Sequence, residues 1–231
     1  MKIITVLKTG GEFKERHVLA LRDSCNKFAP GCEFVCLTDI ELQCNTIQLE
    51  HGWPGWWSKM ELFKLEGPIL YIDLDTIITG DLSALVAKLI GEKFCILRDV
   101  CKGNVNHKAF IDEKKMGSGI MFWKSDMRFL YDDFLKKSVE YMAKFRGDQD
   151  YIESIMWDLD VTYLQDLTDS VVSFKIDLDH GRNYDPAIHR IVFFHGRPRP
   201  WEQSLIPCEL YKIECGALRR FNIWRKNKFR R

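Results

Sequence analysis

The chain has 231 residues, of which 46% are hydrophobic, so it is long enough to bury a substantial core in one large domain. No apolar stretch approaches the length of a membrane span, and the N-terminal residues turn polar too early for a signal peptide, so we expect a cytoplasmic protein. The formal net charge is only +1, but residues 219–231 hold seven basic residues and no acidic residue. The rest of the chain is therefore acidic overall.

This charge distribution divides the chain into a single domain, residues 1–218, and a basic aromatic C-terminal tail, residues 219–231. In the tail, Phe221, Trp224 and Phe229 are interleaved with the cations. The combination predicts a surface that is both anionic and partly apolar, and an anionic membrane surface fits it. Nucleic acid is the alternative partner, because cations neutralise phosphates and aromatic rings stack on bases. Membrane binding would place the protein at the inner face of the membrane.

The first third of the chain predicts alternating strands and helices. Apolar runs and helical periodicity give a strand at Ile3–Leu7, a helix at Lys14–Phe28, a strand at Glu33–Thr38, a helix through residues 60–65 and a strand at Ile69–Asp73. Strand, helix and strand in this order predict parallel neighbours, and the third strand is expected to be parallel as well. The predicted class is α/β, with helices flanking the sheet.

The remaining elements continue this pattern with less regular spacing. We expect helices at Leu82–Ile90, Met127–Phe145 and Asp148–Met156, and strands at Phe94–Leu97, Ile120–Trp123 and Arg190–Phe194. The small residues Gly117, Ser118 and Gly119 predict a turn before the strand at 120–123. The last strand runs into the segment HGRPRPW, residues 195–201.

The segment YIDLDTIITGDL, residues 71–82, places Asp73 and Asp75 at the end of the third strand. Their side chains share one face, because alternate residues of a strand point to the same side. A buried carboxylate is costly unless it is paired or holds a metal, and ligands collect at the carboxyl ends of strands in open α/β sheets. The pair therefore predicts a site for Mn²⁺ or Mg²⁺, which can in turn hold a diphosphate.

Two other interpretations of the pair remain open. Aspartates at a strand end can simply cap a turn. The letters DLDTI also resemble the D-x-D-x-T pattern of haloacid dehalogenase phosphatases, which would make Asp73 a nucleophile, Asp75 a general acid/base and Thr76 a phosphate-supporting residue. That resemblance covers only five residues.

Five segments in chain order resemble nucleotide-sugar glycosyltransferases of the GT-A fold, particularly the glycogenin and lipopolysaccharide galactosyltransferase group. They are GWWSKMELF (55–63), PILYIDLDTIITGDL (68–82), GSGIMFW (117–123), GDQDYI (147–152) and HGRPRPW (195–201). The resemblance spans residues 2–201 and implies a single Rossmann-like GT-A domain with a mostly parallel central sheet. It implies metal-dependent transfer of a sugar from a nucleoside diphosphate sugar, a UDP-sugar, to an acceptor hydroxyl with retention of configuration.

The resemblance also implies a binding role for five residues. Asp73 is similar to the family aspartate that touches both the ribose and the metal, and Asp75 to the second aspartate, a direct metal ligand. His195 is similar to the third protein ligand of the metal. Lys59 is similar to the basic residue that holds the nucleotide end of the donor, and Arg199 would replace a lysine that binds the diphosphate.

Two further residues are expected beside the donor sugar. Asp148 is similar to the aspartate that hydrogen-bonds sugar hydroxyls, and Gln149 would lie beside the anomeric carbon. The chain departs from the family ending H-x-x-G-x-x-K-P-W because His195 directly precedes Gly196, and it has Gly117 where the family commonly has Asn. The acceptor stays open among a lipid-linked glycan, a protein and a modified DNA base. A non-catalytic nucleotide-sugar or nucleic-acid binding protein is the alternative to an enzyme.

Overall fold

A computed structural model describes residues 1–99 and 115–206, so the predicted tail lies outside the described residues. In chain order the elements are β1 (Lys2–Leu7), α1 (Glu15–Phe28), β2 (Glu33–Thr38), β3 (Thr46–Gln48), the 3₁₀ helix η1 (Gly55–Lys64), β4 (Ile69–Ile72), β5 (Thr76–Ile78), α2 (Ser83–Leu89), β6 (Phe94–Arg98), β7 (Met116–Trp123), α3 (Arg128–Lys136), α4 (Ser138–Lys144), α5 (Asp148–Met156), β8 (Thr162–Tyr163), α6 (Leu164–Leu167), β9 (Val171–Ser173), β10 (Ile191–Phe193) and the 3₁₀ helix η3 (Pro200–Glu202). None of the described helices is long and apolar enough to span a membrane.

The central sheet has seven strands in the order β3-β2-β1-β4-β7-β6-β8. Strands β3, β2, β1 and β4 are parallel neighbours, and β8 is parallel to β6. Strand β7 is antiparallel to both β4 and β6. The predicted α/β class with a mostly parallel sheet is therefore confirmed.

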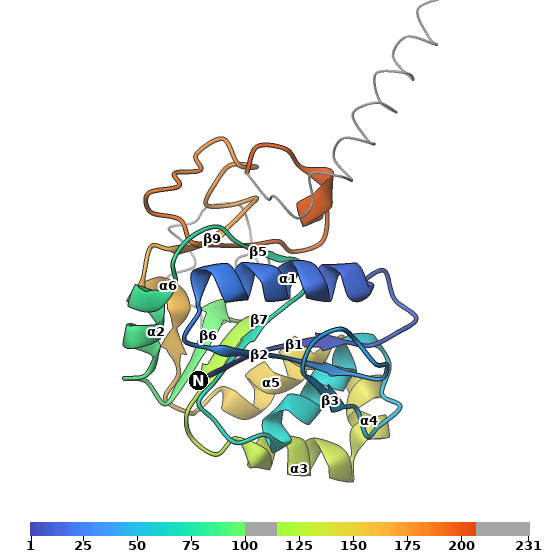
Figure 1. The fold of residues 1–231 in the computed structure, drawn as a ribbon. Coiled ribbons are helices and arrows are strands. Elements are labelled where there is room, and N and C mark those ends of the chain that lie inside the picture. Colours follow the sequence, from blue (N-terminus) through green and yellow to red (C-terminus); the bar gives the residue numbers. More distant parts are fainter. Residues whose placement is uncertain (100–114, 207–231) are drawn as a thin grey trace, which may run out of the picture.

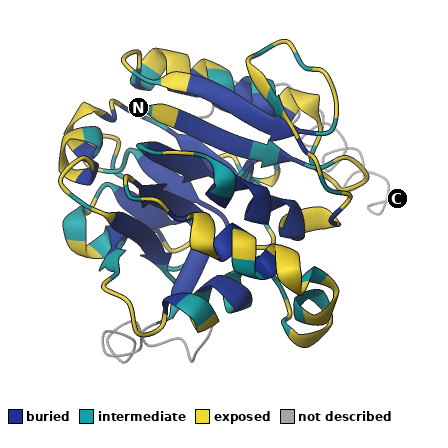
Figure 2. Ribbon diagram, turned by 90° about the horizontal axis from the view of Figure 1, so that it is seen from below, coloured by how far each residue is buried: buried dark blue, intermediate teal, exposed yellow. Residues whose placement is uncertain are grey.

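Helices cover both faces of this sheet, with α1, α2 and α6 on one side and η1, α3, α4 and α5 on the other (Figure 1). Every residue of β4 is buried, and its side chains alternate between two hydrophobic clusters. Ile69 and Tyr71 pack with η1, α3 and α5, whereas Leu70 and Ile72 pack with α1 and α2. Figure 2 shows the sheet as a buried layer beneath its helices. A strand buried on both faces needs the continuous apolar run that predicted it.

A second sheet of three short strands, in the order β5-β10-β9, extends the chain beyond the carboxyl end of β4. Strand β5 follows β4 after three residues and pairs with β10 in the antiparallel sense, with Thr76 opposite Phe193. One step further, the Phe194 N–H donates to the carbonyl of Asp75 at 3.1 Å. This pairing brings the start of the 195–201 segment beside the two aspartates.

Three details differ from the sequence-based expectations. Residues 117–119 are not a turn but part of β7, and the pairing of β7 with β6 shifts register between Ile96 and Leu97. The single helix expected at 127–145 is two helices, separated at Lys137, whose extended φ of −137° interrupts the helical backbone. The helix expected through residues 60–65 is a 3₁₀ helix that begins earlier, at Gly55.

Candidate active site

The two aspartates occupy different surroundings although they lie one residue apart. Asp73 directly follows β4, and its N–H donates to the carbonyl of Gly119 on β7 at 2.8 Å. Asp75 directly precedes β5 and is held by the backbone of Phe194. Strands β4, β7 and β10 therefore converge on this pair, at the carboxyl end of β4 where an open α/β sheet binds ligands.

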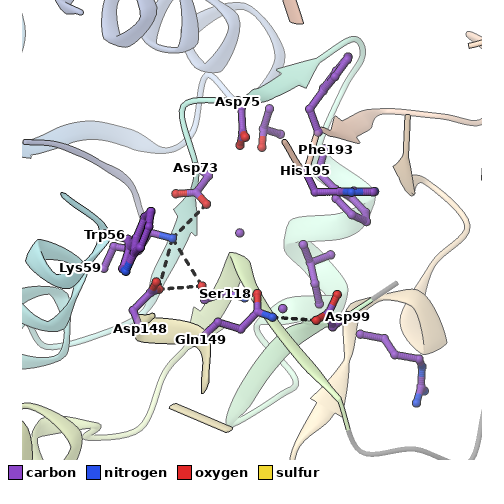
Figure 3. Close-up of a pocket in the computed structure, with 16 residues that line it drawn as sticks. Trp56, Lys59, Asp73, Asp75, Asp99, Ser118, Asp148, Gln149, Phe193 and His195 are labelled. Carbon is purple, nitrogen blue, oxygen red and sulfur yellow. Dashed lines mark hydrogen bonds and ion pairs between the residues drawn. The ribbon is translucent and has the colours of Figure 1, made fainter. Parts of the chain in front are cut away.

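A buried lysine connects Asp73 to the start of α5. Lys59 Nζ lies 3.0 Å from Asp73 Oδ2 and 3.3 Å from Asp148 Oδ2, and its side chain is only 11% exposed. Ser118 Oγ on β7 donates to the same Asp148 carboxylate at 2.7 Å. Figure 3 shows Lys59 between these three side chains. The structure thus brings together Lys59, Asp73 and Asp148, three predicted donor-site residues that lie far apart in the sequence.

Lys59 stays charged at neutral pH. Burial alone would lower the pKa of this lysine, but the carboxylates of Asp148 and Asp73 hold it above its ordinary value. The hydroxyl of Tyr71 donates to the other oxygen of Asp73, so both oxygens of that carboxylate accept a hydrogen bond. The site therefore contains a fixed positive charge beside a fully oriented carboxylate.

Gln149 follows Asp148 at the start of α5, and its amide is held at both ends. Its Oε1 accepts from the backbone N–H of Ser118 at 3.3 Å, and its Nε2 donates to Asp99 Oδ2 at 2.8 Å. Asp99 follows β6 and is only 8% exposed. An amide has a second lone pair on oxygen and a second hydrogen on nitrogen, so Gln149 can still bind a ligand in this orientation.

Asp75 is paired with Arg199, whose guanidinium donates to Asp75 Oδ2. The Asp75 side chain is 13% exposed. Burial and the neighbouring Asp73 carboxylate raise the pKa of Asp75 to about 7, although Arg199 and Lys59 act in the opposite direction. Arg199 and Lys59 therefore offset only part of the cost of burying Asp75 beside a second carboxylate.

His195 directly follows the β10 pairing and lies on the far side of the site from Lys59 (Figure 3). Its Nε2 is 2.9 Å from Ser173 Oγ at the end of β9, and Lys175 Nζ donates to its carbonyl oxygen. Burial, with a smaller effect of Lys175, lowers the pKa of His195 to about 4. The ring is therefore neutral at physiological pH, the state in which imidazole binds metals.

Two cavities meet at these residues. The smaller, about 220 Å³, is lined by Asp148, Gln149, Asp99 and His195. The larger, about 670 Å³, lies over the end of β1 and the following loop and is lined by residues 6–13 and Arg199. Both are also lined by Trp56, Lys59, Asp73 and Asp75. The paired aspartates thus lie on the boundary between the two cavities.

The residues at this boundary fit a hard divalent cation. Asp73 and Asp75 supply carboxylate oxygens, the ligands that Mg²⁺ and Mn²⁺ prefer. Burial and the Asp73 carboxylate both raise the pKa of Asp75, and a bound cation would act in the opposite direction. The ligand atoms of Asp73, Asp75 and His195 do not all lie within 4.8 Å of one another, so a cation that uses all three would draw these side chains together.

A different group in the described part of the chain does meet that distance, namely Glu50, His51 and Glu61. The buried Glu61 carboxylate accepts the backbone N–H groups of Glu50 and His51, each at 2.9 Å. Lys64 Nζ lies 2.9 Å from both glutamates, and His51 Nε2 bonds to the Tyr131 hydroxyl. Lys64 and two backbone N–H groups already bind these carboxylates, so we assign the group a structural role.

Several residues of the site carried no signal in the sequence. Asp99 and Ser118 hold Gln149 and Asp148, and Ser173 holds His195. Trp56 is 56% exposed and lines both cavities, and a side chain at Gly147 would place its Cβ 3.1 Å from the Trp56 Nε1 atom. Trp56 and Ser118 were connected with the site only because they lie in the segments GWWSKMELF and GSGIMFW.

Comparison with known proteins agrees with this arrangement at the level of fold. No protein-family model matches the chain, and no curated protein matches it. Among solved structures, galactosyltransferase LgtC in complex with donor and acceptor sugar analogues has a TM-score of 0.61 at 12% identity, covering 94% of this chain and 96% of its own. The chain has the GT-A fold. At 12% identity the likeness shows the fold alone.

Two further structures share this fold. The apo form of the glycosyltransferase GlyE from Streptococcus pneumoniae TIGR4 has a TM-score of 0.61 at 16% identity. It covers 98% of this chain, but this chain spans only 63% of that protein. A glycosyltransferase involved in glycosylation of the major capsid of PBCV-1 has a TM-score of 0.50 at 10% identity, covering 83% of this chain and 92% of its own. The GT-A core is thus common to chains of different length.

Proposed function

We propose that this chain is a glycosyltransferase that moves a sugar from a UDP-sugar to an acceptor hydroxyl, with a bound divalent cation and with retention of configuration. The observation that carries the proposal is the position of Asp73 and Asp75 between a large cavity and a small one. A nucleotide needs more room than one sugar, so the 670 Å³ cavity would take the nucleoside and the 220 Å³ cavity the sugar. The diphosphate then lies at the boundary.

Asp73, Asp75 and His195 would hold the cation, Mn²⁺ or Mg²⁺. When bound, the cation neutralises charge that develops on the departing diphosphate. Lys59 adds fixed positive charge at the same boundary, where positive groups that need not reorganise stabilise a developing anion most effectively. Arg199 adds a second positive charge beside Asp75. Lys59 is already oriented by two carboxylates, so its charge is in place before the donor binds.

In the small cavity, Asp148 and Asp99 present carboxylate oxygens to sugar hydroxyls. Gln149 is oriented by Ser118 and Asp99, so its remaining amide hydrogen and lone pair have fixed directions beside the anomeric carbon. An amide is a poor nucleophile, which favours attack by the acceptor from the face of the leaving group. Trp56 lines both cavities with an exposed ring on which a sugar face can pack.

The test is calorimetric titration of UDP with and without Mn²⁺, on the wild type and on Asp75→Ala. We expect Mn²⁺ to strengthen UDP binding to the wild type, and we expect the variant to lose this dependence while it stays folded. Incubation with a panel of UDP-sugars, followed by NMR of the released sugar, identifies the donor and the anomeric configuration. UDP binding that is unchanged in Asp75→Ala, with Mn²⁺ still required, would refute the assignment of Asp75.

The same experiments separate the alternatives. A non-catalytic binding protein would bind UDP and release no sugar from any donor. A phosphatase would cleave a small phosphoester through Asp73 as nucleophile. Both oxygens of Asp73 already accept hydrogen bonds, from Tyr71 and Lys59, and this arrangement suits a fixed ligand better than an attacking group.

A further inference from the structure

Arg199 serves two carboxylates at once. Its guanidinium donates to Asp75 through one terminal nitrogen and to Glu12 through the other. Glu12 belongs to the loop after β1, so the arginine connects the loop over the large cavity with the paired aspartates. Its side chain is 15% exposed and its Cζ lies 5.2 Å from the centre of the Phe13 ring.

The backbone of Arg199 is held independently of these ion pairs. Its N–H donates to Glu202 Oε2 at 2.8 Å, and Trp201 stacks on His17 of α1 with 4.3 Å between ring centres. Within the described residues, the buried Nε of Arg199 has no hydrogen-bond partner. The arginine therefore has a fixed backbone, two carboxylate partners and one buried donor without a partner, and it lines a cavity large enough for a nucleotide.

Arg199 and a divalent cation compete for the same carboxylate, that of Asp75. The guanidinium of Arg199 donates a hydrogen bond to one oxygen of the Asp75 carboxylate, which would also be a ligand of the cation. Two positive groups on one carboxylate repel each other. A diphosphate reverses this relation, because it supplies oxygens to both the cation and the guanidinium. A cation that binds alone weakens this ion pair, whereas a cation that binds with a diphosphate gives Arg199 another anion.

We propose that Arg199 is a positioning residue that couples cation binding to diphosphate binding. The proposal rests on the proposed function, because it takes a nucleoside diphosphate as the ligand of the large cavity. Without that ligand, Arg199 occupies Asp75 and keeps the cation affinity low. With it, Arg199 turns from Asp75 to the diphosphate, and the cation takes the released carboxylate. Cation and nucleotide then strengthen each other's binding by the same factor, as linkage requires.

The test is a four-way titration of the wild type and of Arg199→Ala, which measures Mn²⁺ affinity with and without UDP and UDP affinity with and without Mn²⁺. We expect Arg199→Ala to bind Mn²⁺ alone about tenfold more tightly and UDP alone about tenfold more weakly, within the usual range of coupling between sites. Changes of opposite sign set this role apart from a merely structural one, since a distorted site would lose affinity for both ligands.

Arg197→Ala is the matched control. Arg197 lies two residues away and carries the same charge, but it is 70% exposed and pairs with Glu202 and Glu12, not with Asp75. Its removal should leave Mn²⁺ affinity unchanged. Glu12→Gln is a second variant, at a position whose side chain is 40% exposed. It provides a test of the proposal even if Arg199→Ala does not fold. It frees Arg199 from one carboxylate, so UDP alone should bind more tightly.

The outcomes separate the two proposals. Mn²⁺ affinity that is unchanged or lower in Arg199→Ala, while the wild type binds Mn²⁺ and UDP together, overturns the coupling role and leaves the proposed function intact. An equal gain in Mn²⁺ affinity in Arg197→Ala also overturns it, because net charge alone would then explain the effect. A wild type that binds UDP under neither condition overturns the proposed function, and the coupling role with it.

Discussion

At the scale of single residues, the buried side chain of Lys59 is expected to stabilise the fold. Replacing Lys59 by Met leaves the carboxylates of Asp73 and Asp148 without their shared partner. Breaking a buried ion pair in this way costs about 3–5 kcal/mol. Urea denaturation of Lys59→Met should show a loss of this size, whereas Arg128→Ala should lose less than about 1 kcal/mol because its pair with Asp132 is exposed. A Lys59→Met loss no larger than that of the control would contradict this role.

Asp99 permits a second prediction at this scale, about catalysis. Asp99→Asn replaces a group that only accepts hydrogen bonds by an amide that can donate to Gln149, so the orientation of Gln149 is no longer unique. Misplacement of a positioned group can lower turnover about 100-fold. We expect kcat for sugar release to fall by about that factor, with the Kd for UDP nearly unchanged. An equal loss in UDP affinity would show instead that Asp99 supports the whole site.

The sequence predicts which residues carry the chemistry better than it predicts their partners. Asp73 and Asp75 were predicted because two aspartates at the end of an apolar strand are conspicuous, whereas Asp148 was predicted only from the resemblance of GDQDYI to the glycosyltransferases. The pairing of Arg199 with Asp75 joins residues 124 positions apart, and no local pattern contains that contact. Asp99 was not predicted, because its contact with Gln149 also joins distant parts of the sequence. In addition, a single aspartate after a strand has many ordinary explanations.

At the scale of elements, the sequence predicts strands with a continuous apolar run well, and it predicts very short strands and the small-residue start of β7 poorly. Strands β2 and β4 were predicted to within one residue because a buried strand needs a continuous apolar run. Strands β5, β8 and β9 have only two or three residues each, too few to establish a period of two. The second sheet was missed on this account, although it carries His195 to the site.

The contact between α1 and η3 gives a prediction about pH. His17 on α1 is fully buried, and burial, reinforced by Arg16, lowers its pKa from 6.5 to about 4. Between these values the unfolded chain binds the proton and the folded chain does not. The free energy of unfolding should therefore decrease as the pH falls from about 6.5 to about 4, by up to about 1.4 kcal/mol per pH unit for this residue. His195 contributes in the same direction.

Urea denaturation between about pH 7 and pH 5 measures this slope. His17→Phe keeps a ring against Trp201 and removes the titrating group, so its slope should be shallower than that of the wild type. His180→Asn is the control, because His180 is exposed and its loss should leave the slope unchanged. Equal slopes for the wild type and His17→Phe would show that the acid sensitivity arises elsewhere.

At the scale of the whole molecule, the proposed donor site uses residues of the GT-A core, and these residues do not specify the acceptor. The proposed donor cavities are lined by residues of β1, η1, β4 and β7 and by residues 193–195 and 199. An acceptor has to approach from outside this framework. The basic aromatic tail at 219–231 is not among the described residues that line these cavities, and its composition favours binding to an anionic surface. We therefore predict that the tail binds the acceptor or the surface that carries it.

Truncation after residue 218 tests this separation. The last predicted donor-site residue is Arg199, so the truncated protein should bind UDP with Mn²⁺ as the full chain does. The truncation removes seven cations and three aromatic residues, and each cation contributes about 1 kcal/mol to binding at an anionic lipid surface. Sedimentation with vesicles that contain phosphatidylserine should therefore be salt-sensitive for the full chain and absent for the truncated one. Salt-sensitive gel retardation of DNA by the full chain, without vesicle binding, would favour nucleic acid instead. Loss of UDP binding on truncation would show that the tail belongs to the donor site.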